Sequence, residues 1–196
     1  MSTAESSSEE NVARASREKG PALSLPKGLV IINTGNGKGK TTAALGLLLR
    51  AWGHNMKVIM LQFVKKSTSN YGEHRAARKI GIEIIARGAG FTIGGKNEAE
   101  NKRLSLELWD TAKEMINSRN YQMVVLDEFT YPLKYGWLSA AEVIDFLRHR
   151  PGKVHVVITG RDAPQELIDF ADLVTEMKDI KHPLRKGIKA QEGIEF

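Results

Sequence analysis

An α/β fold, in which a mostly parallel sheet carries helices on both of its faces, is predicted from three features of the sequence. Short apolar runs rich in β-branched residues recur along the chain, and segments with helical periodicity separate them. The connections between these elements are short, as in βαβ units. A glycine-rich loop joins the first apolar run to the first helical segment. Ligands of such sheets bind beyond the carboxyl ends of the strands, so functional residues are expected there.

The first half of the folded region predicts three strands and one helix. Residues 29–33, 58–63 and 82–86 are short, largely apolar runs of the kind found in buried parallel strands. The helix is predicted over residues 41–52, because its apolar residues recur on one face, and Gly53 is expected to be its C-cap. That face carries Ala44, Leu45, Leu48, Leu49 and Trp52.

The middle of the chain predicts a long helix, a strand and a second helix. Residues 97–118 have helical periodicity, and residues 123–126 are an apolar run typical of a buried strand. Ser139 and Glu142 form a capping box that opens the next helix. The inward faces of the two helices are expected to carry Leu104, Leu108, Trp109, Ala112, Met115 and Ile116 in the first, and Val143, Ile144 and Leu147 in the second.

The last third predicts two strands with a helix between them. The strands are expected over residues 154–159 and 173–177. The helix is expected to begin at Asp162 as its cap, with Pro164 in the first turn, and to end near residue 171. The final residues, 189–196, are expected to fray, as chain ends usually do.

The composition is that of one domain preceded by a tail. Of the 196 residues, 41% are hydrophobic and 27% are charged, which is close to globular averages and excludes wholesale disorder. Residues 1–27 are rich in Ser, Glu, Arg and Ala and contain few sizeable apolar residues. We therefore expect a flexible tail at 1–27 and a folded domain at 28–196. The alternative for the tail is a helix over about residues 9–19 that orders only against a partner or ligand.

Several classes of protein are excluded by the composition. The chain has no cysteine, which excludes a disulfide scaffold, a thiolate nucleophile and a Cys-ligated metal site. The longest nearly apolar run, residues 43–49, is far shorter than the roughly 18 residues of a membrane span, and the first ten residues are unlike a signal peptide. We therefore expect a soluble, cytoplasmic protein with no membrane partner. The net charge of +6 suits an anionic ligand, although a generic basic surface is the commoner reason for such a charge.

Residues 34–42, with the sequence TGNGKGKTT, form the glycine-rich loop. Their end, Gly39-Lys40-Thr41, matches the phosphate-loop pattern G-x-x-x-x-G-K-[ST], whereas the first glycine position is Thr34 and Gly35 is expected to take over the turn. Backbone N–H groups in such a loop form a nest for phosphate oxygens, and the following helix adds its positive end. Lys40 would add a full charge, and the Thr41 hydroxyl would bind Mg²⁺. The alternative, a plain glycine turn, is disfavoured by the strand and helix on either side.

Residues at three other strand ends are candidates for the same site. Asp127 and Glu128 directly follow an apolar strand, where carboxylates of phosphate-loop proteins bind or orient the metal. The alternative is that this acidic pair is simply an exposed strand end. Arg161 ends another strand and would either stabilise phosphate charge or cap the structure. The loop at 88–95 is rich in glycine, and Phe91 in it either faces the site or packs on the core.

These motifs leave the reaction open among kinase, hydrolase, transferase and nucleotide-dependent nucleic-acid binding. A kinase usually has an arginine-rich lid, and no such cluster is visible. Nucleic-acid binding is suggested by basic residues near the C-terminus, but aromatic residues for base stacking are absent from that run. The run comprises Lys178, Lys181, Arg185, Lys186 and Lys189.

The combination of motifs resembles the P-loop family of ATP:corrinoid adenosyltransferases. The resemblance covers about residues 28–196 and implies a P-loop NTPase-like (RecA-like) fold. It is carried by TGNGKGKTTAA (34–44), LQFVK (61–65), GFT (90–92), VLDEFTY (125–131), ITGR (158–161) and KAQEGIEF (189–196).

The resemblance implies a transferase that moves the 5′-deoxyadenosyl group of ATP to the cobalt of a reduced Co(I) corrinoid. The products would be adenosylcobalamin or its precursor and inorganic triphosphate. ATP and a corrinoid such as cobalamin are the implied substrates, with Mg²⁺, or alternatively Mn²⁺, as the metal. The implied partners are a second subunit in a homodimer and an electron donor such as a reduced flavoprotein, with no nucleic acid. A helix in the N-terminal tail would cover the corrinoid.

The resemblance also assigns roles to residues of this sequence. Lys40 and Phe91 would be catalytic, and Thr41, Glu128 and Asp127 would serve the metal. Phe91 would lie on the lower face of the corrin and help to displace the lower axial ligand, which makes cobalt easier to reduce. Ile93 stands where the family can have Trp, and it can exclude water but cannot stack. The residues implied to bind ATP are Gly35, Asn36, Gly37, Lys38, Gly39, Lys40, Thr41, Thr42 and Arg161.

Overall fold

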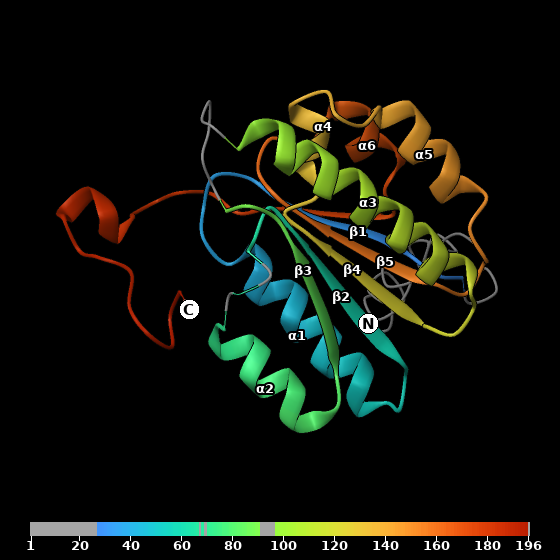
Figure 1. Ribbon diagram of the computed structural model, residues 1–196, viewed down its shortest axis with the longest axis horizontal. Helices are drawn as coiled ribbons and strands as arrows, with labels where there is room; N and C mark the ends of the chain where they lie inside the picture. The colour runs from blue at the N-terminus through green and yellow to red at the C-terminus, as the bar shows by residue number, and fades with distance from the viewer. Residues whose placement is uncertain (1–26, 67, 69, 91–96, 196) are drawn as a thin grey trace, which may run out of the picture.

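The computed structural model describes residues 27–66, 68, 70–90 and 97–195 (Figure 1). Its centre is a six-stranded sheet in the order β3-β2-β4-β5-β1-β6, and every neighbouring pair is parallel. The strands are β1 (Val30–Thr34), β2 (Val58–Phe63), β3 (Glu83–Arg87), β4 (Met123–Asp127), β5 (His155–Thr159) and β6 (Leu173–Glu176).

The strand order brings the carboxyl ends of β1, β5 and β4 together. β5 lies between the other two, with Ile158 paired to Ile32 on one side and to Leu126 on the other. All five residues of β1 and of β4 are buried, as expected for strands covered on both faces. The phosphate loop after β1, the acidic pair at the end of β4 and Thr159 at the end of β5 therefore meet at one edge of the sheet.

Helices α1 (Lys40–Gly53) and α2 (Gly72–Ile80) cover one face of the sheet (Figure 1). Alternate strand residues point towards them, because side chains of a strand alternate between its faces. This face forms its own apolar cluster, in which Ala44 and Leu48 of α1 and Ala77 of α2 pack on the sheet. The strand residues of the cluster include Ile31, Met60, Val125 and Val157.

The remaining α-helices cover the opposite face (Figure 1). They are α3 (Glu98–Asn117), α4 (Thr130–Lys134), α5 (Ala140–Arg148) and α6 (Gln165–Phe170). A larger apolar cluster fills this side, in which Trp109 of α3 contacts Phe129 and Phe146 with ring centroids 5.0 Å and 5.4 Å apart. Helices thus lie on both faces of a parallel sheet, which confirms the predicted α/β fold class.

Three predictions about helices were wrong: the buried face of α1, the C-cap of α1 and the N-cap of α6. Leu49 and Trp52 are 52% and 41% exposed, so the buried stripe of α1 is narrower than its apolar pattern. Gly53 belongs to the helix, and His54 is the C-cap. Asp162 is not a helix cap, because α6 begins after Pro164, and the Asp162 carboxylate instead pairs with Lys134 at 2.6 Å. Helices α2 and α4 were not predicted.

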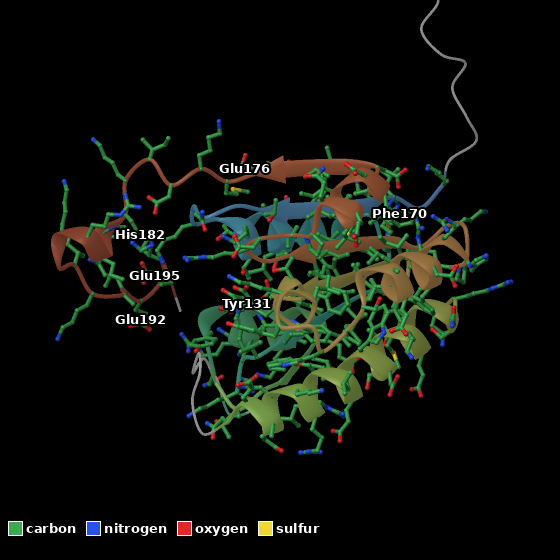
Figure 2. All side chains as sticks on the ribbon, turned by 90° about the horizontal axis from the view of Figure 1, so that it is seen from above. Tyr131, Phe170, Glu176, His182, Glu192 and Glu195 are labelled. Carbon is green, nitrogen blue, oxygen red and sulfur yellow. The ribbon has the colours of Figure 1, made fainter. Side chains whose placement is uncertain are left out.

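The C-terminal segment returns to the protein and does not simply fray. It leaves β6 at Glu176, passes through a 3₁₀ turn, η1 (Pro183–Lys186), and comes back through Glu192 and Glu195 (Figure 2). Two ion pairs tie its end to the body of the protein, Lys38 to Glu195 at 3.0 Å and Arg75 to Glu192 at 3.6 Å. In the part of the chain that the structure describes, no helix is both long and apolar enough to cross a membrane.

Candidate active site

A cavity of about 920 Å³ lies at the carboxyl edge of the sheet, where the strand ends meet. Its volume is in the range of pockets that enclose a nucleotide-sized ligand. The phosphate loop forms one wall and the first turn of α2 another, while the start of the loop after β5 and the returning C-terminal segment complete it. Predicted site residues that line it are Asn36, Gly37, Lys38, Gly39, Lys40, Thr41, Thr42, Glu128 and Arg161.

Lys40 is held inside the phosphate loop. Its ammonium group donates to the carbonyl oxygens of Gly35 at 2.7 Å and Gly37 at 2.6 Å, and the residue is only 8% exposed. Burial lowers the pKa of Lys40, and the Glu128 carboxylate opposes that shift. Gly35 has a φ of 93°, and a Cβ there would lie 2.6 Å from the Met177 carbonyl oxygen. Gly35 therefore makes the turn expected of it, in a conformation that side chains rarely adopt.

Asp127 is the most densely hydrogen-bonded carboxylate of the site. Its Oδ1 accepts from the hydroxyls of Thr41 at 2.8 Å and Thr159 at 2.7 Å. Its Oδ2 accepts from the side-chain amide of Gln62 and from the ammonium of Lys65, both at 3.1 Å. Asp127 is fully buried, and these four donors offset the cost of burying its charge. Donors from β2, from the turn after β2, from β5 and from the first turn of α1 therefore converge on one carboxylate at the end of β4.

Glu128 has an acceptor atom without a hydrogen-bond partner. Its Oε2 is buried and unpaired among the described residues, while its carboxylate faces the cavity beside Lys40. The backbone of Glu128 has a φ of 59°, a strained conformation for a residue other than glycine. Burial and the neighbouring Asp127 raise the pKa of Glu128 to about 6. A buried carboxylate oxygen with no donor is what a cation-binding position at a phosphate site requires.

The raised pKa of Glu128 predicts a pH-dependent gain in stability for Glu128→Gln. A carboxyl whose pKa is 4.5 when unfolded and about 6 when folded costs no stability below pH 4.5 and an increasing amount as the pH rises through 6. In the ligand-free protein we expect Glu128→Gln to be more stable than wild type by about 2 kcal/mol at pH 7, and to match it near pH 4. Urea unfolding at both pH values measures this, and a gain of equal size at both would contradict it.

Lys65 was not predicted as a site residue, and a strained turn aims it at the site. Val64 has a φ of 66°, and the amide of Lys65 donates to the carbonyl of Phe63 at 2.7 Å. This tight turn brings the Lys65 ammonium back over the sheet edge, between Asp127 at 3.1 Å and Glu73 of α2 at 3.5 Å. Burial lowers the pKa of Lys65, but the carboxylates of Asp127, Glu73 and Glu128 together outweigh burial, so the pKa of Lys65 is raised.

Two tyrosines and a lysine on and beside α4 also line the cavity. Tyr131 and Tyr135 stack with their ring centroids 6.2 Å apart, and Lys134 between them pairs with Asp162. Burial raises the pKa of Tyr131 to about 12, so this hydroxyl stays protonated at neutral pH. The short helix α4 contains Pro132 and only five residues, which is too few for a periodic pattern to show.

The C-terminal segment contributes a wall of the cavity. Gly193, Ile194 and Glu195 line it, and Glu195 forms the ion pair with Lys38 of the phosphate loop. Lys38 thus has a carboxylate partner in addition to facing the cavity. Asn36 and Arg161 also line an adjoining hollow of about 500 Å³, together with Lys178 and Arg185. Phe91 and Ile93 lie outside the described residues.

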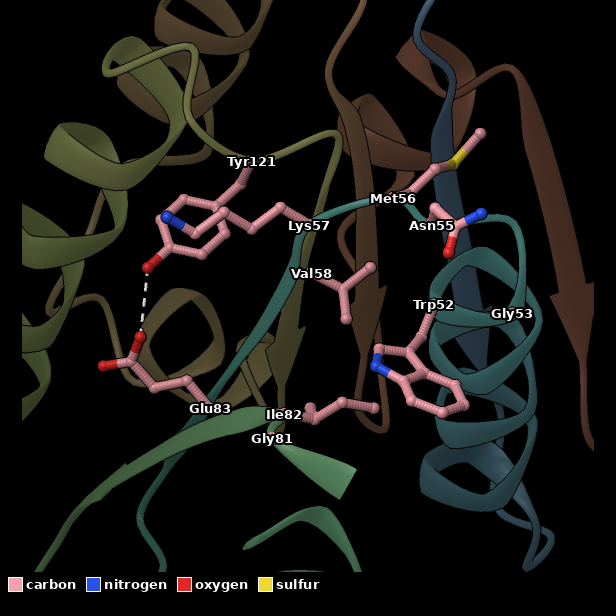
Figure 3. Close-up of a pocket in the computed structure, with 10 residues that line it drawn as sticks. All are labelled: Trp52, Gly53, Asn55, Met56, Lys57, Val58, Gly81, Ile82, Glu83 and Tyr121. Carbon is pink, nitrogen blue, oxygen red and sulfur yellow. Dashed lines mark hydrogen bonds between the residues drawn. The ribbon is translucent and has the colours of Figure 1, made fainter. Parts of the chain in front are cut away.

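A second cavity, of about 470 Å³, lies at the opposite edge of the sheet (Figure 3). The start of β2 at Val58, the residues around the start of β3 and Trp52 of α1 line it. Its polar side chains largely satisfy one another, because the Tyr121 hydroxyl donates to Glu83 at 3.0 Å and the Lys57 ammonium lies 5.0 Å from the Tyr121 ring centre. Parallel sheets bind their ligands at the other edge, so this cavity is not the candidate active site.

The fold and the loop–carboxylate arrangement together define the class of P-loop nucleotide-binding proteins. A solved structure, the flagellar accessory protein FlaH from Methanocaldococcus jannaschii, has the same fold with a TM-score of 0.52 at 13% identity, covering 78% of this chain and 72% of that chain. A family model described as ATP:corrinoid adenosyltransferase BtuR/CobO/CobP matches residues 26–196. The chain belongs to the ATP:corrinoid adenosyltransferase family.

Proteins named as corrinoid adenosyltransferases are similar to this chain over most of their length. A corrinoid adenosyltransferase of Sinorhizobium sp is 42% identical over 93% of this chain and 87% of its own. The corrinoid adenosyltransferase of Escherichia coli (strain K12) is 40% identical, and the corrinoid adenosyltransferase CobA of Salmonella typhimurium is 41% identical. Each of these two covers 87% of this chain and is itself covered to 86%. The resemblance found in the sequence is thereby confirmed, and the chain is a transferase that adenosylates corrinoids at the expense of ATP.

Proposed function

We propose that this enzyme binds the triphosphate of ATP with its phosphate loop and transfers the 5′-deoxyadenosyl group to a Co(I) corrinoid. The observation that carries this proposal is the convergence of Lys40, Thr41 and Glu128 on one cavity, with the buried Asp127 hydrogen-bonded to Thr41, in a chain of the adenosyltransferase family. In the reaction the electron pair of Co(I) forms the Co–C bond to the ribose 5′ carbon. The bond from that carbon to oxygen breaks, and its electron pair leaves with inorganic triphosphate.

Lys40 is the proposed electrostatic partner of the departing triphosphate. Negative charge grows on the leaving oxygen as the bond breaks, and a fixed cation stabilises charge that develops in the transition state. The ammonium group exchanges its contacts with the Gly35 and Gly37 carbonyls for phosphate oxygens. Lys38 and Arg161, which also line the cavity, add positive charge. Lys38 must give up its ion pair with Glu195 to do so.

Mg²⁺, or Mn²⁺ in its place, is proposed to accompany the triphosphate. The described residues contain no group of three or more His, Cys, Asp or Glu side chains able to hold an ion by themselves. An ion here would take the Glu128 oxygen that lacks a partner, the Thr41 hydroxyl, phosphate oxygens and water, with Asp127 orienting Thr41. When bound, it supplies Lewis-acid neutralisation of phosphate charge.

The corrinoid side of the site is proposed on the family resemblance. Phe91 is the proposed residue at the lower face of the corrin, with Ile93 as an apolar neighbour that excludes water. Residues 1–27 are the proposed tail, which supplies a corrinoid-covering helix, and residues 28–196 are the proposed catalytic domain. A homodimer and a reductant such as a reduced flavoprotein complete the proposal.

The phosphate product tests the proposed reaction. With ATP, Mg²⁺, a reductant and cobalamin, we expect a light-sensitive Co–C product and one inorganic triphosphate for each one formed. Attack at carbon leaves the three phosphates joined, whereas a kinase or ATPase cuts off the terminal one. Chromatography of the nucleotides and phosphates gives the measurement. ADP formed in step with corrinoid turnover would overturn the proposed reaction.

A further inference from the structure

A chain of buried hydrogen bonds runs from α2 to Asp127. The backbone amide of Tyr71 donates to Nδ1 of His74 at 3.2 Å. Nε2 of His74 lies 2.6 Å from Oε1 of Gln62, and Nε2 of Gln62 donates to Oδ2 of Asp127 at 3.1 Å. The functions proposed above for the phosphate loop and the carboxylates do not involve this series of hydrogen bonds.

The contact between the Tyr71 amide and Nδ1 of His74 indicates which atom donates in each of the following hydrogen bonds. Because Nδ1 of His74 accepts from a backbone N–H, the proton of the neutral imidazole is on Nε2, which donates to Gln62. Oε1 of Gln62 is thereby the acceptor, so its NH₂ group faces Asp127 and donates to it. The backbone at the start of α2, through His74, and the Asp127 carboxylate, which can only accept, therefore impose the same orientation on the Gln62 amide.

The position of these groups indicates a role beyond packing. His74 is 8% exposed, and Gln62 and Asp127 are fully buried. The buried residues of α2 are His74 and Ala77, so an imidazole occupies one of the few core positions of this helix. Buried polar groups cost stability unless they are hydrogen-bonded, and an apolar residue would fill that position at lower cost.

We propose that His74 is a positioning residue for the phosphate and metal site, acting through Gln62 on Asp127. The hydrogen bonds from His74 through Gln62 hold Oδ2 of Asp127, which leaves Oδ1 facing the hydroxyls of Thr41 and Thr159. Thr41 is thereby oriented for the ion that accompanies the nucleotide. This inference rests on the proposed function only in taking Thr41 as a ligand of that ion.

A second series of contacts from α2 also reaches Asp127, and comparison with it shows what His74 contributes. Glu73, the preceding residue, reaches the same oxygen of Asp127 through Lys65. The Glu73–Lys65 contacts supply a charge beside Asp127, whereas the His74–Gln62 contacts fix its orientation. An amide donates along fixed lines, but an ammonium group donates from three rotatable positions. Loss of His74 therefore leaves Asp127 paired with Lys65 and the two threonine hydroxyls, but it frees the Gln62 amide to turn away from Oδ2.

Mn²⁺ binding in the presence of ATP tests the inference in the full-length enzyme. His74→Ala removes both contacts, whereas His74→Gln can still donate from its amide to Gln62. His155→Ala is the matched control, because Nδ1 of His155 also accepts a backbone amide, that of Leu29 at 3.1 Å, far from the site. Electron paramagnetic resonance gives the Mn²⁺ affinity, and ¹⁵N nuclear magnetic resonance of the imidazole gives the tautomer of His74.

We expect His74→Ala to weaken Mn²⁺ binding by about 10- to 100-fold, as for other residues that orient a metal ligand. His74→Gln should recover most of the affinity, His155→Ala should stay within about twofold of wild type, and wild-type His74 should carry its proton on Nε2. Wild-type affinity in His74→Ala, failure of His74→Gln to recover it, or a proton on Nδ1 would each overturn the inference. These readouts do not need corrinoid turnover, so failure of the proposed reaction would be seen separately, as absence of a Co–C product in wild type.

Discussion

Replacement of Lys40 by alanine is expected to reduce the rate of adenosylation by at least about 100-fold, because one fixed charge on a developing anion is worth that much in other enzymes. The ammonium group sits at the start of α1 and contacts only loop carbonyls among the described residues. It therefore contributes to the site and little to the core. Steady-state formation of the Co–C product measures the loss.

Two further variants separate this effect from a general loss of structure. Lys40→Met keeps the apolar stem, so it should match Lys40→Ala in rate while its midpoint of thermal unfolding stays within about 4 °C of wild type. Lys57→Ala removes a lysine from the cavity at the other edge of the sheet and should leave the rate unchanged. Near-wild-type turnover in Lys40→Met would show that the phosphate loop is not where the leaving group is stabilised.

The strands and the phosphate loop could be predicted because local pattern determines them. A strand buried on both faces, such as β4, needs a continuous apolar run, and such runs are visible in the sequence. The loop needs glycine where φ is positive, as at Gly35 and Gly39, and glycine is equally visible. The strand order could not be predicted, because it depends on which strands pair across the whole domain.

Helix α2 and the contacts around Asp127 were missed for a physical reason. The inward face of α2 carries His74 and Ala77 where a periodic pattern would have large apolar residues, so the helix has no apolar stripe. Gln62 lies within an otherwise apolar strand, and its polarity alone does not reveal a partner on another strand. Both features become intelligible only when β2 and β4 pair side by side and place Gln62 opposite Asp127.

The return of the C-terminal segment was also beyond local reasoning. It depends on charges that are distant in the sequence, Lys38 with Glu195 and Arg75 with Glu192. Lysine, arginine and glutamate side chains are common on any surface, and no spacing rule links these four positions. The motif at 189–196 pointed to the segment through family resemblance, not through any physical signal in the residues themselves.

Replacement of Asp127 by alanine is expected to cause the largest loss of stability of any change at the site. Thr41, Thr159 and Gln62 would lose their acceptor, and the Lys65 ammonium, only 22% exposed, would lose its nearest counter-charge. Removal of one partner of a buried ion pair typically costs about 3–5 kcal/mol. For a chain of this length that corresponds to a fall of roughly 6–20 °C in the midpoint of thermal unfolding. Calorimetry measures it, and activity should be lost as well.

A double-mutant cycle with Lys65 shows where that cost comes from. If most of it is the stranded ammonium group, then Lys65→Met added to Asp127→Ala should restore a large part of the lost stability, because the buried charge is removed and the stem still packs. Asp127→Asn should be milder than Asp127→Ala, since its NH₂ group can face the threonine hydroxyls, which also accept, while its carbonyl still accepts from Gln62 and Lys65. A double variant no more stable than Asp127→Ala would assign the loss to the three unpaired donors and the cavity instead. In that case Asp127 would serve the site as a hydrogen-bonding hub, and its charge would matter for the ligand and not for the fold.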